Sequence, residues 1–430
     1  MSSKLSGGVG VCLLLACAAF GPYLAAGVRT EQVAVYGVAL LVLLSMVWAT
    51  RLRHATGTAQ AVVLLMAVQI AAATVGMIGV GQVQTIRAPG SAVSGFDNLL
   101  LPVAVILTVV TLVNPGRRRA ALNTVCTVAA VAACTNAALA WLSTTTDLSA
   151  WLSPWWSHGG DLAESVQAKQ SETGRYAGMF VQPAEAGEFY SIALIAAVYR
   201  LRNHAALLTA AAAIITVGGL LVASKVFLFV GAPVAVILML AMPSRRGARY
   251  TMLAAACYVI AVAAIAGHLD WLGVTLPAQF MDDGGDLNLF TAGRFGSAGP
   301  ATVVTGWKLV TTYSPIVGFG AGGLWLPYDN GWLEAAVTGG LLGAAAYTGV
   351  FVALIAGWWR SRRPAATAES ALAAGLIAVA VGTSLGLPGT TANRVATVLW
   401  LLLALLLFVK PCPDGAPGRH RLPGRAAAGG

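Results

Sequence analysis

The sequence predicts an all-α polytopic membrane protein with about 12 transmembrane helices and with both termini in the cytoplasm. Three observations predict this class. Apolar residues make up 58% of the chain and charged residues only 10%, whereas soluble domains carry about 25% charged residues. Apolar runs of about 20 residues, the length that spans a bilayer as a helix, recur along the chain. Basic residues gather in every second loop between these runs.

The apolar runs define the expected helices in chain order. They lie near 8–28, 32–50, 58–81, 97–114, 120–142, 186–203, 205–223, 226–243, 250–268, 334–357, 369–388 and 392–410. The first run lacks a convincing small-residue cleavage site, so we expect a retained helix rather than a signal peptide. Ser224 and Lys225 interrupt a nearly continuous apolar stretch, where we expect a tight turn between two helices.

The charge distribution sets the expected orientation. With a cytoplasmic N-terminus, most of the 26 basic residues fall in cytoplasmic loops, as the positive-inside rule predicts. Only Glu369 and Asp414 of the 16 acidic residues lie on that side. The formal net charge of +10 therefore reflects membrane topology, and we expect membrane lipids rather than nucleic acid as partners of the basic loops.

These features predict one transmembrane domain, residues 1–410, followed by a disordered basic cytoplasmic tail, residues 411–430, that is rich in Pro, Gly and Arg. Two extracytoplasmic loops are long, about 143–185 and 269–333. Their tryptophans and helix-like stretches such as DLAESVQAKQ predict ordered structure with short helices at the membrane surface. The six cysteines show no zinc or redox spacing, and we expect neither a metal nor a cofactor.

Basic residues on the outer side depart from the charge bias. They are Arg29, Arg87, Lys169, Arg175, Lys225, Arg294, Lys308 and Arg394. We expect Arg29 and Lys169 to be solvated loop cations and Lys308 to belong to a short amphipathic helix. A cation at a span end, such as Lys225 or Arg394, is costly unless it is paired or serves a site.

Two interpretations of these outer cations remain open from the residues alone. Arg175 and Arg294 lie in glycine-flanked segments that allow close approach of a ligand, and several converging cations favour an anionic, lipid-linked substrate such as a phosphate or diphosphate. Alternatively, the cations form salt bridges with Glu185, Glu188 or Asp286.

The segment from Gly293 to Gly343 is the longest polar, Gly-rich stretch of the chain. Its VGFGAGG run contains a GxGxxG-like string, but a nucleotide site needs a preceding strand and a cytoplasmic location. We therefore expect a close-packing turn there. Asp329, which directly precedes an apolar run, is either a helix cap or a general base for a hydroxyl.

This segment resembles the bacterial O-antigen ligase and polymerase superfamily, membrane glycosyltransferases of the GT-C class. The resemblance rests on motifs that stand in the family's order, with weaker matches upstream in GRYAGMFVQPAEAG (174–187) and in Ala223-Ser224-Lys225. The main motifs are Arg294, Trp307, SPIVGFGAGG (314–323), Asp329-Asn330-Gly331-Trp332-Leu333 and GLLG (340–343).

The resemblance implies transfer of a glycan from an undecaprenyl diphosphate carrier to an acceptor hydroxyl of a glycan or glycolipid. The reaction is expected on the outer face of a bacterial plasma membrane and without metal. It implies catalytic roles for Asp329 and Arg294. The residues expected to bind the diphosphate are Lys225, Arg294, Arg175, Arg87 and Arg394. Those expected to contact the acceptor or the glycan are Asn330, Trp332, Trp307 and Glu188.

Two residues depart from the family's pattern. Asp329 stands where the family has a catalytic histidine, and Lys225 replaces an arginine, which keeps charge but loses bidentate geometry. Both changes favour a polysaccharide polymerase or an unusual ligase. The alternatives from other classes are a transporter or flippase of lipid-linked oligosaccharides, and a peptidoglycan polymerase of the shape-and-division type.

Overall fold

The structure, a computed structural model, describes residues 7–24, 27–78, 91–156, 160–241, 303–323, 328, 330–361, 367–391 and 393–410. These residues are helical apart from turns and one isolated β-bridge, between Tyr23 and Arg29. The all-α class is therefore confirmed for the part of the chain that is described. The helix expected at 250–268 and the tail from 411 lie outside it.

A helix occupies each expected range that falls in the described residues. In chain order they are α1 (Gly7–Ala18), α2 (Thr30–Leu44), α3 (Val47–His54), α4 (Gly57–Ile78), α5 (Ala92–Leu112), α6 (Arg118–Leu142), α7 (Ser149–Trp156), α8 (Gly160–Thr173), α9 (Pro183–Leu201), α10 (Ala205–Leu221), α11 (Ala232–Ala241), α14 (Val303–Tyr313), α15 (Gly331–Ser361), α16 (Thr367–Ser384) and α17 (Arg394–Leu403). Short helical turns extend some of them: η3 (Pro115–Arg117), η4 (Phe227–Gly231), η7 (Ala321–Gly323) and η9 (Ala404–Phe408).

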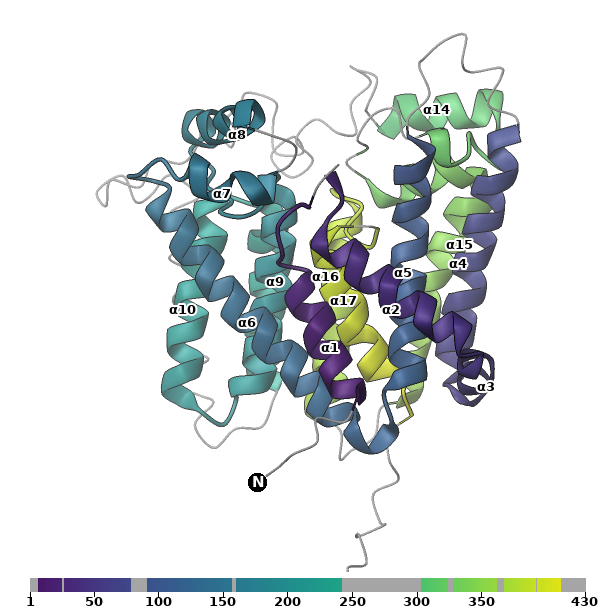
Figure 1. The fold of residues 1–430 in the computed structure, drawn as a ribbon, viewed down its shortest axis with the longest axis horizontal. Coiled ribbons are helices and arrows are strands. Elements are labelled where there is room, and N and C mark those ends of the chain that lie inside the picture. Colours follow the sequence, from purple (N-terminus) through teal and green to yellow (C-terminus); the bar gives the residue numbers. More distant parts are fainter. Residues whose placement is uncertain are drawn as a thin grey trace, which may run out of the picture.

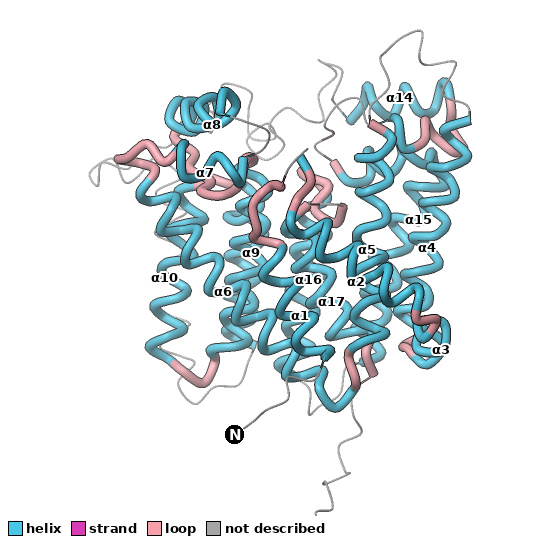
Figure 2. The backbone as a smooth tube through the Cα atoms, in the orientation of Figure 1, coloured by secondary structure: helices cyan, strands magenta, loops and turns pink. Residues whose placement is uncertain are grey.

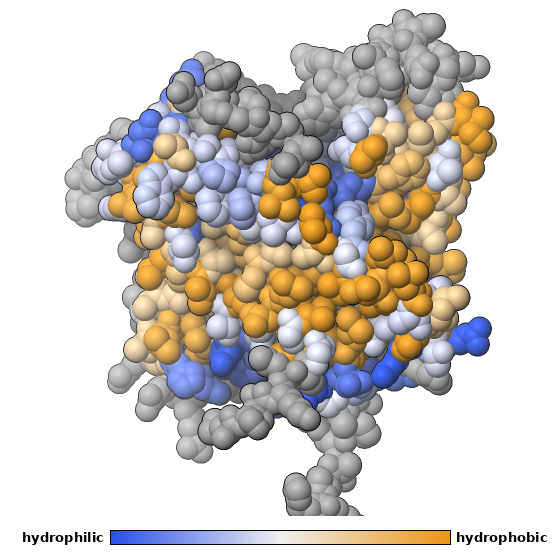
Figure 3. All heavy atoms as spheres, viewed as in Figure 1, coloured by the Kyte–Doolittle hydropathy of each residue, from blue (hydrophilic) through white to orange (hydrophobic). Residues whose placement is uncertain are grey.

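Several of these helices are of membrane-crossing length. Four are long and apolar enough among the described residues, namely α4, α5, α15 and α6 with its preceding turn. The pair α2 and α3 is a fifth candidate, bent by 91° at its break. On the face shown in Figure 3, hydrophobic residues form a broad band across the middle, and hydrophilic residues gather along the lower edge and at the upper left. The finer expectation of about 12 spans stays a prediction.

Helix α17 is the centre of the bundle. It packs against α1, α5, α6, α9 and α16, and every one of its residues is buried. Helices α6, α9 and α10 pack together on one side of it, whereas α4 and α15 form the closest helix pair on the other side (Figure 1). Since α17 contacts α6 and α9 directly, and the turn η9 that continues it packs against α4 and α15, this segment joins the two halves of the fold.

Three short helices lie at one end of the bundle and a fourth, α3, at the other. Helices α7, α8 and α14 are at the end opposite the N-terminus, whereas α3 and the α5–α6 and α9–α10 turns are at the N-terminal end (Figure 2). Helices α7 and α8 pack on each other, and the DLAESVQAKQ stretch lies within α8. The ordered short helices expected in the loop 143–185 are thus confirmed for its described residues.

The glycine-rich turn docks into a break in α15. Gly340 has φ 63° and ψ −157°, which interrupts the helix. The amides of Leu341 and Leu342 are thereby free to bond to the carbonyls of Pro315 and Ile316, at 2.8 and 3.2 Å. In return the Phe319 amide donates to the Val337 carbonyl at 2.7 Å.

The two motifs GFGAGG and GLLG therefore form one packed unit. Gly318 and Gly320 both have positive φ, and a Cβ on either glycine would overlap neighbouring backbone. The close-packing turn expected from the glycine run is confirmed.

Two helices near the N-terminus differ from expectation. Helix α1 ends at Ala18 rather than near 28, because Gly21 and Pro22 follow and proline cannot continue a helix. Helix α2 ends at Leu44, where Met46 takes a left-handed conformation with φ 55°. Because α1 ends early, Tyr23 and Arg29 approach the start of α17.

Candidate functional site

A cavity of ≈ 400 Å³ lies between the segment after α1 and the starts of α9, α15 and α17. This volume is in the range of about 300–1,000 Å³ that is usual for small-molecule sites. Charged side chains from four segments line it: Arg29, Glu185, Glu334 and Arg394. Neutral lining residues include Tyr23, Asn98, Trp155, Gln182, Thr391 and Asn393. The site therefore combines two cations and two carboxylates.

Arg394 is the first residue of α17 and is only 3% exposed. Asn393 caps the helix, its Oδ1 accepting from the Ala396 amide at 2.7 Å. The Arg394 guanidinium donates to the Met179 carbonyl at 3.2 Å and to the Trp155 carbonyl at 3.0 Å. These carbonyls fix the direction of the guanidinium but leave its positive charge in place.

Tyr23 and Glu185 complete the surroundings of Arg394. The guanidinium carbon lies 5.1 Å from the centre of the Tyr23 ring, which is a cation–π contact. The Glu185 carboxylate accepts a hydrogen bond from the backbone amide of Arg394. Burial raises the pKa of Tyr23, against the opposing effect of the positive charges of Arg394 and Arg29. The phenol is therefore neutral at physiological pH and can donate a hydrogen bond.

Arg29 is not the solvated loop cation that we expected. Its side chain is 12% exposed and forms ion pairs with Glu31 at 3.1 Å and Asp97 at 3.3 Å. Asp97 also accepts from Gln32 at 2.7 Å and from Tyr36 at 2.6 Å. The expectation was wrong because α1 ends early and the following segment folds down onto α2 and α5, which removes Arg29 from water.

Glu334 supplies the second carboxylate. It is 7% exposed and stands in the first turn of α15. Its Oε1 accepts from the Asn98 amide at 3.0 Å. Thr391 lies beside the same carboxyl, and its hydroxyl donates to the Pro388 carbonyl at 2.7 Å. Asn330 sets the start of this helix, because its Oδ1 accepts from the Leu333 amide at 2.9 Å. Asn98 and the helix start together hold the Glu334 carboxyl at the cavity wall.

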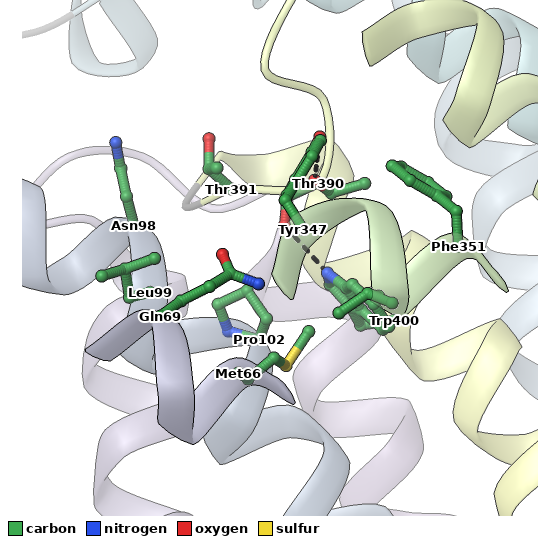
Figure 4. Close-up of a pocket in the computed structure, with 11 residues that line it drawn as sticks. Met66, Gln69, Asn98, Leu99, Pro102, Tyr347, Phe351, Thr390, Thr391 and Trp400 are labelled. Atoms are coloured by element: carbon green, nitrogen blue, oxygen red, sulfur yellow. Dashed lines mark hydrogen bonds between the residues drawn. The ribbon is translucent and has the colours of Figure 1, made fainter. Parts of the chain in front are cut away.

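A second, smaller pocket shares Asn98 and Thr391 with the cavity. Its volume is ≈ 30 Å³, enough for about one water molecule. The Gln69 amide points into it (Figure 4). Tyr347 bonds to the Thr390 hydroxyl at 2.8 Å, and the Trp400 indole donates to the Thr390 carbonyl at 2.9 Å. These bonds fix the turn before α17 on which Thr391 stands.

The other expected site residues that the structure describes do not line the cavity. Glu188 is fully buried, with its Oε1 accepting from the Thr383 hydroxyl at 3.3 Å and Gly389 packed on its carboxyl group. Glu188 thus packs against the turn before α17 and does not line the cavity, so a glycan contact by it stays a prediction. Asn330 acts on the site through the helix start, and its amide also donates to the Leu385 carbonyl at 3.2 Å.

Trp332 and Trp307 belong to packing clusters. Trp332 packs against Tyr347 and Phe351 with ring centres 5.5 Å apart in both pairs. Trp307, on α14, packs partly buried against the cluster that contains Val310. Neither tryptophan is among the described residues that line the cavity, so a direct glycan contact by either stays a prediction.

Arg175 and Lys225 lie on neighbouring segments. The Arg175 Nε donates to the Val222 carbonyl at 3.1 Å, and the Tyr176 amide donates to the Leu221 carbonyl at 2.9 Å. Gly187 packs directly on Ser224. The two weaker motifs of the sequence are therefore adjacent in space, although neither cation is among the described residues that line the cavity.

Arg87, Arg294 and Asp329 lie outside the described residues. The groups that sequence reasoning missed are Tyr23, Arg29, Asn98, Glu185 and Glu334 as cavity residues. One signal was present for Glu185 and Glu334, because each stands in the first turn of an apolar helix, where a buried charge needs a partner or a function. Among the described residues there is no cluster of side chains suited to a metal ion.

Comparison with known proteins adds no relative. No protein-family model matches the chain, and no curated protein matches it.

Proposed function

We propose that this chain is a glycosyltransferase of the O-antigen ligase and polymerase type. It transfers a glycan from an undecaprenyl diphosphate carrier to an acceptor hydroxyl at the outer face of a bacterial plasma membrane. The observation that carries the proposal is Arg394, a buried guanidinium that begins the central helix and lines a cavity between apolar helices. The motif order of the segment from Gly293 to Gly343 supports the same reaction.

The chemistry of the leaving group requires fixed positive charge. As the bond from the anomeric carbon to the diphosphate breaks, negative charge grows on the diphosphate oxygens, and cations that are already in place stabilise it most. Arg394 is held by the Met179 and Trp155 carbonyls, so it needs little reorganisation. Arg29 lines the same cavity. We assign the diphosphate to the part of the cavity that Arg394 and Arg29 line. Further contacts are proposed for Arg294, Lys225, Arg175 and Arg87.

The position of the cavity suits a lipid-linked donor. Its walls include α5 and α15, two of the helices that are long and apolar enough to cross a membrane. A prenyl chain can therefore stay in the bilayer while its diphosphate enters the cavity. The acceptor needs a base for its proton. The family resemblance points to Asp329 for this role, and Asn330 next to it begins the helix that forms the cavity wall.

The proposal is tested with the purified full-length chain in detergent and in vesicles, with a prenyl diphosphate-linked oligosaccharide as donor. We expect free prenyl diphosphate to accumulate together with a lengthened glycan when acceptor is present. Chelators should not change the rate, because the reaction as proposed uses no metal. Failure to cleave the donor with any polysaccharide acceptor, in protein that elutes as a single folded species, would contradict the proposal.

A transporter of lipid-linked oligosaccharides is the second candidate. The observation that favours it is the 91° break between α2 and α3, because broken helices are common in transporters. The fully buried Glu188, whose Oε2 has no hydrogen-bond partner among the described residues, points the same way. The vesicle experiment separates the two, since a transporter would move intact donor across the bilayer without releasing prenyl diphosphate.

A further inference from the structure

We propose that Glu334 is the general base that removes the proton from the acceptor hydroxyl. The inference rests on the proposed glycosyl transfer. It assigns the residue that activates the attacking acceptor hydroxyl. It differs from the assignment by resemblance, which puts the base at Asp329.

Two carboxylates among the described residues line the cavity, and their surroundings differ. Glu185 interacts with the charges of Arg394 and Arg29 and accepts from the Arg394 amide. Both polar partners of Glu334 in the described part of the chain, Asn98 and Thr391, are neutral. A carboxylate beside a cation accepts a proton less readily than one with neutral partners. Glu185 therefore balances the cations, and Glu334 is the carboxylate suited to accept a proton.

The Glu334 carboxyl is also held in a fixed direction. The Asn98 amide donates to Oε1 at 3.0 Å, and the Asn330 cap fixes the helix that carries the side chain. Thr391 lies beside the carboxyl, with its hydroxyl bonded to the Pro388 carbonyl at 2.7 Å. A carboxylate has about four lone-pair positions, so these bonds leave capacity for an acceptor hydroxyl. A base that is oriented before the substrate arrives is what efficient proton transfer requires.

The turn before α17 connects the two halves of the proposed reaction. Thr391 contacts the base, and Asn393 caps the helix that begins with Arg394. Hydrogen bonds from Tyr347 and Trp400 to Thr390 also fix this turn. The turn that lies beside the base therefore leads directly into the helix that carries the cation for the leaving group.

The step is balanced as a single displacement. The acceptor O–H bond breaks and its proton passes to the Glu334 carboxylate. The oxygen forms a bond to the anomeric carbon, while the bond from that carbon to the diphosphate oxygen breaks. The electron pair leaves with the prenyl diphosphate towards Arg394. The proton on Glu334 then returns to water.

Glu334→Gln tests the assignment with little structural change, because the amide oxygen can still accept from Asn98 and the amide nitrogen can donate to Thr391. We expect the turnover number to fall about 10²–10⁴-fold, the range for loss of a general base, with the donor KM nearly unchanged. The matched control is Glu172→Gln, an exposed glutamate on α8, which should transfer at the wild-type rate.

Azide gives a second readout that a structural role would not produce. Azide attacks without losing a proton, so Glu334→Ala with azide should form a glycosyl azide and release prenyl diphosphate. Wild-type turnover by Glu334→Gln, or no azide product from folded Glu334→Ala, overturns the assignment. If wild-type protein itself releases no prenyl diphosphate, the proposed function fails instead, so the two failures are distinguishable.

Discussion

The guanidinium of Arg394 stacks on the ring of Tyr23, with its carbon 5.1 Å from the ring centre. This contact joins the first residue of the central helix to the segment that follows α1. Both residues line the cavity, which Glu334 lines as well. A site at the end of the bundle is thus built from the two ends of the chain together.

Arg394 should be required for cleavage of the donor. Arg394→Ala removes the buried charge, and Arg394→Lys keeps a charge but loses the fork that bonds to Met179 and Trp155. We expect initial rates of prenyl diphosphate release to fall at least about 10²-fold in the alanine variant and less in the lysine variant. Arg360→Ala, an exposed arginine at the far end of α15, is the control. Equal rates in all four proteins would remove Arg394 from the site.

Gly340 should be required for stability. Its φ of 63° strains any side chain, and a Cβ there would overlap the backbone of Ile316 and Val317. We expect Gly340→Ala to cost roughly 1–3 kcal/mol or more and to lower the Tm in detergent. The control is Gly37→Ala on α2, where a Cβ meets nothing within 4 Å. An unchanged Tm for Gly340→Ala would show that the turn does not depend on the break in α15.

Asn136, on α6, should position Met179 and thereby Arg394 at the cavity wall. Its side chain accepts from the Met179 amide at 2.8 Å and donates to Tyr190 at 2.8 Å, and Met179 in turn bonds to Arg394. Asn136→Leu leaves these buried groups unpaired, at about 1–3 kcal/mol each. We therefore expect a lower Tm together with a higher KM for the donor. Asn123→Leu, at a partly exposed position on the same helix, should leave both values near wild type.

The two candidate bases can be compared directly. With Glu334 as the base, Glu334→Gln should reduce the turnover number at least about tenfold more than Asp329→Asn does, as expected for loss of a general base relative to a neighbour. Rates are measured under saturating donor, so that effects on binding do not enter. A larger loss in Asp329→Asn would return the role to the residue that the resemblance indicated.

Much of the fold could be predicted from composition and charge. Apolar runs are long and separated by turn residues, so the order of helices follows from hydrophobicity alone, and the glycine run was correctly interpreted as a packing turn. The bends could not be predicted. The end of α1 at Ala18 and the break after Leu44 depend on local backbone conformations that the apolar pattern does not encode.

The site was predictable only in part. Arg394 was singled out because a cation inside a span end is costly. The burial of Arg29 was not predicted. Its ion pairs with Glu31 and Asp97 depend on how the start of α2 packs against α5. Glu334 received no role, because its partner Asn98 comes from a distant helix. Contacts between segments far apart in sequence leave no pattern along the chain.

A single-turnover reaction with labelled donor tests the central claim most directly. Purified wild-type protein in excess is mixed with a prenyl diphosphate-linked glycan and an acceptor, and both products are quantified in the same quenched samples. The account predicts that each new glycosidic bond appears together with one free prenyl diphosphate and at the same rate. Intact donor after long incubation, or donor that crosses vesicle membranes without cleavage, would contradict it.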